Sequence, residues 1–410
     1  MDASTQTSPS PVSDTTLARY ADLLVGVGAN VQPDQIVEVK AVLDNAELVR
    51  AVAAASYRRG ARFVETLYFD PYVRRARIEH AAADTLEFVP SWERERVRQL
   101  GEQRCARVGV GPLLPPGLFD DLDPVRTARE PFPTIPETLE LVMTQTTNWA
   151  AAAGPVPAWA RQVYPDLDPQ HALARLWEDI VDVCRLDEED PERAWRERFA
   201  ELAAVTRTLS EAAFDALHFV GPGTDLHVGL LPTSTWMSGT AETVDGIEYA
   251  PNLPTEETFT APDPARADGV VTSTRPLLLR GGTLVHGLVV RFEGGRAVQV
   301  EAASGAEALR EQLRRDDGAS RLGEVALVDR EGRVGRRDTV FWMTLLDENA
   351  ASHLALGRAY PDSVGPEDRE RANHSAVHVD FMIGGDDVDV TGITGDGREL
   401  PLLRGGRWQL

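Results

Sequence analysis

His378 and Asp380 stand one residue apart in the segment His378-Val379-Asp380, and His353 precedes them by 25 residues. On a β-strand, alternate side chains point to the same face, so His378 and Asp380 could contact a single ion. Two imidazoles and one carboxylate form a ligand set that occurs in metal sites. The same residues also fit a simpler interpretation, in which the strand histidine only forms a hydrogen bond with its neighbouring aspartate.

Three glutamates add further metal-capable groups. Glu256 and Glu257 follow a proline turn in NLPTEE, and Glu324 begins the apolar stretch in LGEVAL. An unpaired charge on a buried strand is costly, so Glu324 needs a partner. Glu256 and Glu257 have an alternative role as exposed loop charges or as charges at a helix start. Adjacent side chains of an extended segment face opposite ways, so these two glutamates are not expected to bind the same ion.

Residues 349–360 are predicted to form a helix. Their spacing would place His353 and Tyr360 two turns apart on one face of that helix. A histidine on an Ala- and Leu-rich helix is also typical of a core, and a tyrosine before proline is typical of a packed aromatic. Each signal therefore has an explanation without metal, and only their combination indicates a metal centre.

The first half of the chain alternates predicted strands and helices. Strands are expected at residues 36–39, 63–68 and 106–110. A capping pattern at Asp44 and a stop at Gly60 enclose the helix between the first two strands. The Asp-Pro pairs at 168–169 and 190–191 predict the starts of two longer helices with buried aromatic residues. This βαβ order predicts a parallel sheet.

From about Gly221 the pattern changes to short β-rich segments between Gly, Pro and Asp turns. Helices are few there, and residues 306–313 are the clearest besides 349–360. Asp225 and His227 share one face of the strand expected in GTDLHVGL, and we interpret both as structural residues or as residues that support the metal ligands, in preference to being ligands themselves. Strands are further expected at residues 270–274, 283–292, 297–300, 324–328, 377–383 and 388–392.

A chain of 410 residues exceeds the size at which one hydrophobic core usually keeps growing. We expect an α/β N-terminal domain with a parallel sheet at residues 17–210. A β-rich α+β C-terminal domain at residues 211–410 is expected to bind the metal and to carry the catalytic residues. Residues 1–16 are rich in Ser, Thr and Pro, show no signal-peptide pattern and are predicted to form a disordered tail.

The composition excludes several classes of protein. Hydrophobic residues make up 42% of the chain and charged residues 26%, as in a globular protein, while the net charge of −23 repels phosphate backbones and anionic lipids. We therefore expect neither nucleic-acid nor membrane partners. No apolar run approaches the roughly 20 residues that span a bilayer, which favours a cytoplasmic protein. The two cysteines, Cys105 and Cys184, predict buried small hydrophobic side chains and no disulfide framework.

Several long segments, in order, resemble one known family. They are GPGTDLHVGL from Gly221, APNLPTEETFTAPD from Ala250, SRLGEVALV from Ser320, LLDENAASHLALGRAYP from Leu345 and HVDFMIG from His378. The segments LARYADLLVGVGANVQPDQ and ASYRRGARFVE extend the resemblance over nearly the whole chain after the tail. The chain thus resembles the aminopeptidase T and aminopeptidase S family, metallopeptidase family twenty-nine.

The resemblance implies a two-metal exopeptidase that removes N-terminal residues from peptide substrates, works as a homodimer and keeps its active site in an internal cavity. Two divalent ions (Zn, Co, Mn or Mg) would be the cofactors. Carried over to this chain, the metal ligands would be one glutamate of the Glu256-Glu257 pair, for which we favour Glu257 over Glu256, together with Glu324, His353, Tyr360, His378 and Asp380, with no ligand position substituted.

Metal chemistry gives these residues their expected roles. A carboxylate can bridge two ions roughly 3.5–4 Å apart, and we assign that role to Glu324. The ions would lower the pKa of a shared water, so that a metal-bridged hydroxide attacks the scissile carbonyl. Glu256, the member of the glutamate pair not used as a ligand, is the candidate base. Tyr360 either binds metal or stabilises the oxyanion.

Two alternative functions belong to other classes. Two histidines and one carboxylate also hold iron in mononuclear Fe(II) oxygenases, although the additional carboxylates disfavour this assignment. The chain could instead be a non-catalytic peptide-binding scaffold of the same fold. Metal stoichiometry separates the first alternative from the peptidase, and an assay of peptide hydrolysis separates the second.

Overall fold

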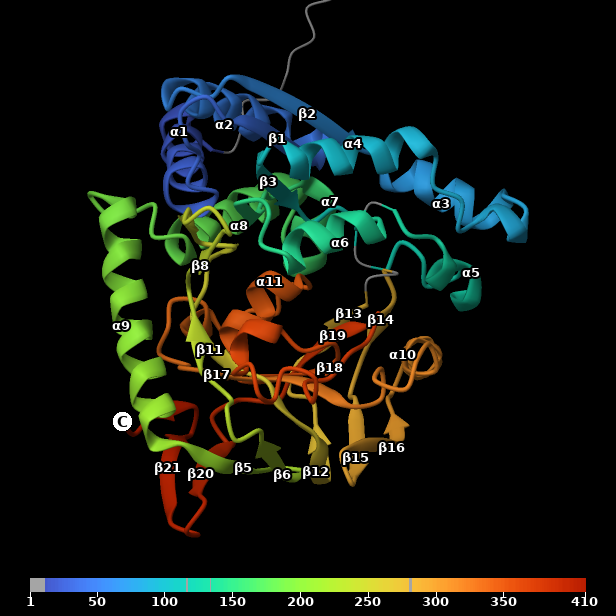
Figure 1. Ribbon diagram of the computed structural model, residues 1–410. Helices are drawn as coiled ribbons and strands as arrows, with labels where there is room; N and C mark the ends of the chain where they lie inside the picture. Colours follow the sequence, from blue (N-terminus) through green and yellow to red (C-terminus); the bar gives the residue numbers. More distant parts are fainter. Residues whose placement is uncertain (1–11, 116, 133, 280–281) are drawn as a thin grey trace, which may run out of the picture.

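The computed structural model describes residues 12–115, 117–132, 134–279 and 282–410. It contains two parts that face each other, one built on a parallel sheet and one on two antiparallel sheets (Figure 1). The predicted disordered tail at 1–16 lies mostly outside the described residues. Its last three residues are helical, because α1 (Asp14–Leu23) begins at the Ser13 cap, whose hydroxyl accepts the Thr16 N–H.

A five-stranded sheet with all neighbours parallel organises the first part, as predicted from the βαβ order. Its order is β10-β4-β3-β1-β2. Buried valines and alanines alternate along the inner strands, which is why these segments form a sheet. The strands are β1 (Ile36–Val42), β2 (Phe63–Phe69), β3 (Ala106–Gly111), β4 (Trp149–Ala153) and β10 (Asn252–Leu253).

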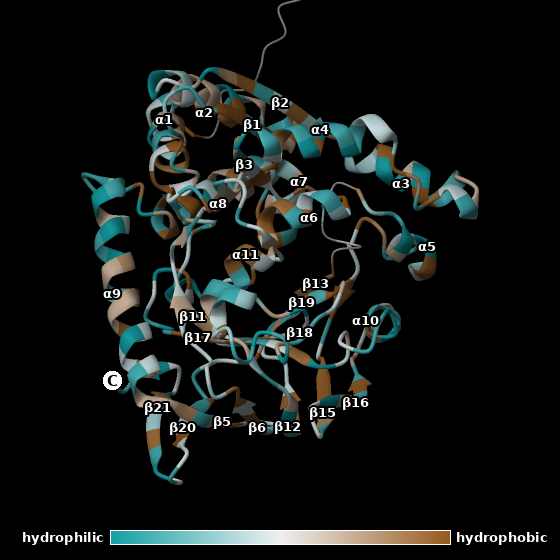
Figure 2. Cartoon of the chain, viewed as in Figure 1, coloured by the Kyte–Doolittle hydropathy of each residue, from teal (hydrophilic) through white to brown (hydrophobic). Residues whose placement is uncertain are grey.

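Amphipathic helices cover this sheet. In α2, Leu48, Val49, Val52 and Ala55 form the buried face. Figure 2 shows that α3 and α4 are largely hydrophilic, in agreement with their exposed position in Figure 1. The helices are α2 (Ala46–Arg58), α3 (Pro71–His80), α4 (Ser91–Glu102), α5 (Pro124–Arg129), α6 (Pro136–Met143), α7 (Pro157–Val163) and α8 (Pro169–Val183).

Two of these helix starts confirm the interpretation of the Asp-Pro pairs. The Asp168 carboxylate caps α8, and the Asp190 carboxylate accepts the Arg193 N–H at the start of α9 (Pro191–Ala212). The aromatic residues Trp177 and Trp195 are buried, as expected. At 22 residues, α9 is about 33 Å long, and it runs from the first part down to the antiparallel sheets (Figure 1).

An eight-stranded antiparallel sheet forms the far side of the second part, in the order β16-β15-β12-β6-β5-β20-β21-β22. The predicted strand at 283–292 is interrupted, because only residues 284–285 and 289–293 are extended. The sheet consists of β5 (Phe214–Gly221), β6 (Thr224–Leu230), β12 (Pro262–Thr272), β15 (Val289–Glu293), β16 (Arg296–Glu301), β20 (Asp389–Thr394), β21 (Glu399–Arg404) and β22 (Arg407–Trp408).

A second antiparallel sheet lies between the eight-stranded sheet and the first part (Figure 1). Its order is β19-β18-β17-β11-β7. The helix predicted at residues 306–313 is present as α10 (Ala306–Leu313). The strands are β7 (Met237–Ser238), β11 (Glu257–Thr260), β17 (Leu322–Val328), β18 (His353–Gly357) and β19 (His378–Met382).

Short elements complete the described chain. They are β8 (Ala241–Glu242), β9 (Glu248–Tyr249), β13 (Leu277–Leu278), β14 (Leu284–Val285) and α11 (Thr344–Asp347). None of the helices among the described residues has both the length and the apolar composition needed to cross a membrane.

The prediction of a helix at residues 349–360 is wrong. A short 3-10 turn at Glu348–Ala350 is followed by β18, in which all five residues, His353 to Gly357, are buried. A central strand covered on both faces has a continuous apolar sequence, which lacks the alternation that would distinguish it from a buried helix. Pairing with β17 and β19 decides the outcome.

Candidate metal centre

Strand register brings the predicted metal ligands to one face of the five-stranded sheet. Glu324 on β17 lies opposite Ala355 on β18, which lies opposite Asp380 on β19. Residues directly opposite each other in an antiparallel sheet share a face. The small Ala355 side chain separates the two carboxylates and leaves space above the sheet. Val325 and Leu354, which alternate with these residues, face the hydrophobic core instead.

The same register adds the two histidines and Glu257. His353 pairs with Ala326, and His378 pairs with Gly357, so both imidazoles lie on the Glu324 face. Glu257, at the start of β11, lies opposite Val328. Val328 and Glu324 are separated by an even number of positions on β17, so Glu257 lies on the same face as Glu324. Five of the predicted metal ligands therefore come together from four neighbouring strands.

The distances divide these side chains into two groups that share Glu324. His353 Nε2 lies 3.1 Å from Glu257 Oε2 and 3.6 Å from Glu324 Oε1. His378 Nε2 lies 3.5 Å from Glu324 Oε2 and 3.2 Å from Asp380 Oδ1. Within each group the possible ligand atoms lie within 4.8 Å of one another. Glu324 thus presents one oxygen to each group, which is the arrangement required of a bridging carboxylate.

Backbone carbonyls orient both imidazoles. His378 Nδ1 lies 2.8 Å from the Arg358 carbonyl oxygen, and His353 Nδ1 lies 3.3 Å from that of Ala351. A carbonyl oxygen that accepts a hydrogen bond from Nδ1–H keeps the proton on Nδ1 and leaves Nε2 free to bind a cation. In both residues Nε2 is the atom that faces the carboxylates.

Burial and mutual repulsion dominate the electrostatics of this centre. Glu257, Glu324 and His353 are at most 7% exposed. Burial raises the pKa of Glu324, and the Glu257 and Asp380 carboxylates add to that increase. Although burial lowers the pKa of His353, its contacts with Glu257 and Glu324 raise the value well above that of a free histidine. The cluster therefore retains protons at positions that divalent cations would otherwise occupy.

The donor set fits divalent metal ions. Glu257 Oε2 is buried and lacks a hydrogen-bond partner among the described residues, although His353 Nε2 is close to it. Such an oxygen costs free energy unless a cation or a proton satisfies it. Carboxylates with imidazoles suit Zn²⁺, Co²⁺ and Mn²⁺, and two ions would offset the concentrated negative charge.

Tyr360 reaches the centre by a different route from the one predicted. It follows β18 and is not on a helix with His353, but its ring packs edge-on against His378 with 5.3 Å between centroids. The Phe259 ring also packs edge-on against Tyr360, with 5.7 Å between the ring centroids. Burial, with the Glu324 and Asp380 carboxylates, raises the pKa of the Tyr360 hydroxyl above its ordinary value. A protonated hydroxyl is a hydrogen-bond donor.

The structure does not bring Glu256, the predicted base, to this centre. Its two oxygens are held by Arg185 at 2.9 Å and by Arg198 at 2.7 Å. Its backbone N–H donates to Asn349 Oδ1. Adjacent side chains at the start of β11 face opposite ways, as predicted, so Glu257 takes the metal side and Glu256 the arginine side. A carboxylate engaged by two guanidinium groups is a poor base.

Glu348 is the site residue that the sequence reasoning missed. Burial, together with the nearby Glu257 and Asp380 carboxylates, raises its pKa well above the usual range, and Glu324 and His353 also interact with it. Its 3-10 turn is held by Asp347, which accepts the Phe341 and Met343 N–H groups. The acidic residue Glu348 in the otherwise apolar segment LLDENAASH could have indicated a site residue. The predicted helix instead favoured His353 and Tyr360 as the ligands from this segment.

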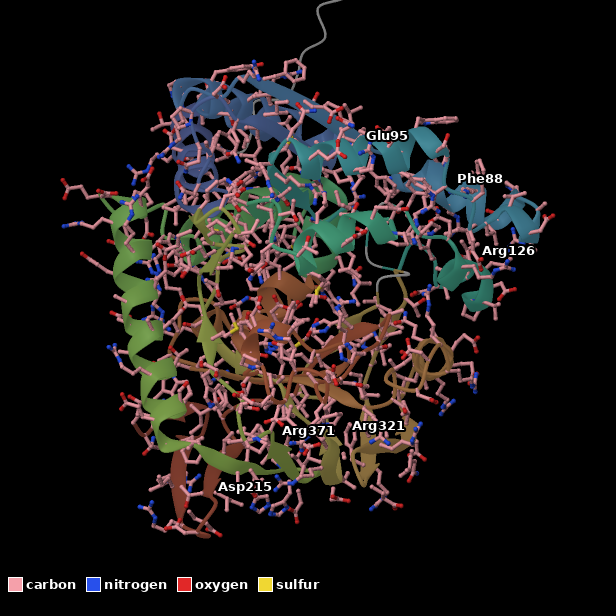
Figure 3. All side chains as sticks on the ribbon, viewed as in Figure 1. Phe88, Glu95, Arg126, Asp215, Arg321 and Arg371 are labelled. Carbon is pink, nitrogen blue, oxygen red and sulfur yellow. The ribbon has the colours of Figure 1, made fainter. Side chains whose placement is uncertain are left out.

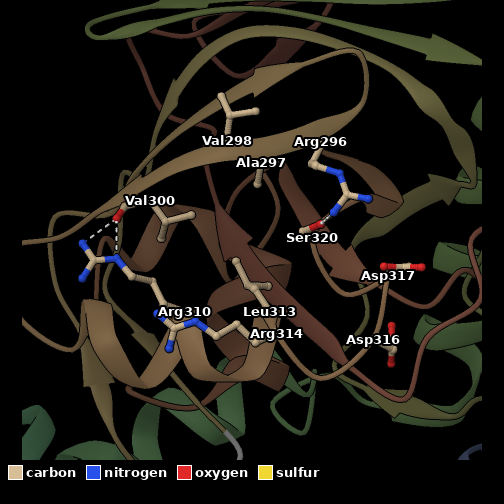
Figure 4. Close-up of a pocket in the computed structure, with 10 residues that line it drawn as sticks. All are labelled: Arg296, Ala297, Val298, Val300, Arg310, Leu313, Arg314, Asp316, Asp317 and Ser320. Carbon is tan, nitrogen blue, oxygen red and sulfur yellow. Dashed lines mark hydrogen bonds between the residues drawn. The ribbon is translucent and has the colours of Figure 1, made fainter.

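A surface cavity of about 690 Å³ beside α10 is separate from the metal centre (Figure 4). Its arginines already have partners. Arg310 donates to the Val300 carbonyl oxygen, and Arg296 donates to Ser320 Oγ. The cavity therefore adds no ligand to the centre.

A buried cluster of carboxylates and imidazoles that shares one glutamate between two ligand groups defines the class of metal-dependent hydrolases. Within that class, the chain belongs to the thermophilic metalloprotease (M29) family, whose sequence model matches residues 13–408.

Characterised relatives cover almost the entire chain. Aminopeptidase T of Thermus aquaticus is 41% identical over 405 residues, which are 96% of this chain and 98% of the relative. Aminopeptidase 2 of Geobacillus stearothermophilus is 37% identical over 96% of this chain and 97% of its own length. The solved structure of wild-type AmpT from Thermus thermophilus is 40% identical and superposes with a TM-score of 0.88, covering 96% of this chain and 99% of that one. The fold and the family resemblance inferred from the sequence are thereby confirmed.

Proposed function

We propose that this chain removes N-terminal residues from peptides at the centre formed by Glu257, Glu324, His353, His378 and Asp380. The observation that carries the proposal is the position of Glu324, which lies within 3.6 Å of both histidines and connects the two ligand groups. The chain is a metal-dependent aminopeptidase, and neither an Fe(II) oxygenase nor a scaffold is favoured.

Two divalent ions, from among Zn, Co, Mn and Mg, are the proposed cofactors. When bound, they would activate a water molecule and polarise the scissile carbonyl group. The chain contributes the arrangement around them. Glu324 holds the two ligand groups together, the backbone carbonyls orient the imidazoles, and Glu257, Glu324 and His353 are buried away from bulk water.

The remaining polar groups have proposed roles in positioning and proton transfer. Glu348 takes the role of base that sequence reasoning gave to Glu256, because it faces the cluster while Glu256 is held by two arginines. Tyr360, beside His378, donates a hydrogen bond to the oxygen of the reacting carbonyl. In its neutral form, the free α-amine of a peptide N-terminus would be able to bind one of the two ions, which would restrict cleavage to chain ends.

The experiment compares an aminoacyl-p-nitroanilide with its N-acetylated counterpart. The protein is stripped with a chelator and reloaded separately with Zn²⁺, Co²⁺, Mn²⁺ or Mg²⁺, and bound metal is counted. We expect about two ions per chain and cleavage of the free-amine substrate alone. Equal cleavage of both substrates would contradict the exopeptidase, and bound metal without cleavage would support the scaffold. One redox-active iron per chain in the protein as purified, before the chelator is added, would support the oxygenase.

Two finer features belong to the same proposal. We infer a homodimer in the cytoplasm, on the basis of the family and of the net charge of −23. Sedimentation should give twice the chain mass of 44.8 kDa.

A further inference from the structure

A second group of metal-capable side chains lies on the eight-stranded sheet, on strands that contribute nothing to the centre described above. β5 and β6 pair so that His218 lies directly opposite His227, and Val220 lies opposite Asp225. His227 and Asp225 are two residues apart and share a face. These strands lie at the lower end of Figure 1, and Asp215, one residue after the start of β5, is labelled there in Figure 3.

The three side chains converge closely. The His218 and His227 rings stack with 3.8 Å between centroids and 15° between planes. His218 Nε2 lies 2.8 Å from Asp225 Oδ1. One ligand atom from each residue lies within 4.8 Å of the others. Two imidazoles and one carboxylate at this spacing can surround a single transition-metal ion, with water at the remaining position.

A purely structural role does not account for this group. The Asp225 side chain is 79% exposed and that of His218 is 28% exposed, so their hydrogen bond seals no core. An exposed pair of this kind contributes at most about 1 kcal/mol to stability. The interpretation of Asp225 and His227 as structural or supporting residues, made from the sequence alone, stays a prediction.

The surroundings favour a cation. Asp268 on β12 lies directly opposite His227 and is exposed, so its carboxylate adds negative charge beside this imidazole. The nearby Arg266 is paired with Asp215 at 2.6 Å and does not compete for the site.

We propose that His218, Asp225 and His227 form a second binding site for a divalent transition-metal ion of the Zn²⁺ type, on the outer sheet and independent of the catalytic centre. The alternation of Asp225 and His227 along one strand can be read from the local sequence. His218 joins them only through the pairing of β5 with β6.

The test measures bound Zn²⁺ in the full-length protein by equilibrium dialysis, in wild type and in His227→Gln. Both proteins keep the same catalytic centre, so the ions bound there contribute equally and do not affect the difference in Zn²⁺ content between the two. His171→Gln is the matched control, since His171 also forms an exposed pair with an aspartate, Asp168, but has no second imidazole in that pair. We expect one more ion per chain in wild type and in the control than in His227→Gln. The affinity for that ion should fall by about tenfold or more on substitution.

Two results would overturn the site: the same Zn²⁺ content in His227→Gln as in wild type, or an equal loss in His171→Gln. Zinc-edge anomalous diffraction supplies a second measurement, in which a peak between His218 and His227 supports the site and the absence of a peak in Zn²⁺-soaked crystals contradicts it. Peptidase activity should be unchanged in His227→Gln. Because the difference in Zn²⁺ content needs no activity, failure of the proposed function would not affect it.

Discussion

At the scale of single residues, the neighbouring carboxylates Glu256 and Glu257 perform opposite tasks. Glu257 lies 3.1 Å from His353 Nε2, whereas Glu256 is held by Arg185 and Arg198. The alternation of side chains at the start of β11 causes this division. A carboxylate between two guanidinium groups stabilises the fold, and one among other carboxylates instead recruits cations.

The pair of substitutions Glu257→Gln and Glu256→Gln tests this division. Glu257→Gln should lower metal content and reduce kcat by about a hundredfold or more, because a ligand is lost. Glu256→Gln should leave the metal content unchanged and lower the free energy of unfolding by about 3 kcal/mol, since it leaves Arg185 and Arg198 poorly compensated. Metal analysis and urea unfolding of both variants provide the measurements. Loss of metal in Glu256→Gln alone would reverse the assignment.

Tyr360→Phe separates the two roles considered for the hydroxyl group. If the hydroxyl donates to the reacting oxygen, kcat should fall by about tenfold to a thousandfold while metal content stays constant. The ring contacts with His378 and Phe259 are retained in phenylalanine. Steady-state kinetics with metal analysis on the same samples provide the measurement. Loss of metal with unchanged kcat per loaded centre would instead make Tyr360 a ligand.

At the scale of elements, local sequence patterns predicted most of the strands and the main helices but failed at β18. The βαβ rhythm, the Asp-Pro caps of α8 and α9, and α10 are all as expected. β18 is buried on both faces, so its sequence does not distinguish a strand from a helix. Its hydrogen bonds to β17 and β19, which lie far from it in sequence, determine its conformation.

Lys40 lies on β1 of the parallel sheet, and its charge makes the stability of the fold depend on pH. Burial, with the positive charges of Arg107 and Arg96, lowers the pKa of Lys40 on β1 to about 8, although Glu38 opposes the shift. In the unfolded chain its pKa is about 10.4. The unfolded chain therefore binds more protons between these values, and this residue makes stability rise with pH over that window.

Lys40→Met should raise the free energy of unfolding at pH 7 by about 1–3 kcal/mol, because the buried ammonium group is removed. Glu38 keeps its contacts with Arg96 and Arg107 in this variant. The gain should shrink between about pH 8 and pH 10.4, as wild-type Lys40 loses its proton. Urea unfolding at several pH values measures it. In Lys40→Arg, whose charge does not titrate over this range, the rise in stability with pH that Lys40 gives to the wild type should be absent. A gain that is constant with pH would contradict the argument.

At the scale of the whole molecule, the second half of the sequence contributes to the hydrophobic core of the first part. Leu253, Val334, Phe341 and Leu346, from the second half of the sequence, pack in the same cluster as the strands of the parallel sheet. β10, at residues 252–253, is itself a member of that sheet. The boundary predicted at residue 210 falls within the last turn of α9 and remains a prediction.

A fragment comprising residues 213–410 should not fold by itself. Separation would expose the four side chains above, at a cost of about 1.5–3 kcal/mol each, which is comparable to the 5–15 kcal/mol stability of a typical protein. Near-ultraviolet circular dichroism and urea titration should show neither fixed tertiary packing nor a cooperative transition, with the full chain as the control. A cooperative transition in the fragment would instead establish an independent domain.

The sequence by itself determined the types of the metal ligands, the parallel sheet of the first half, the β-rich second half and the family. These features depend on residue identity and on local periodicity, which can be read from the chain directly. Only the tertiary structure decided that Glu257 and not Glu256 faces the histidines, that Glu348 joins them, and that His218 meets His227. The physical reason is that strand register and side-chain facing are set by hydrogen bonds between segments distant in sequence, which no local pattern specifies.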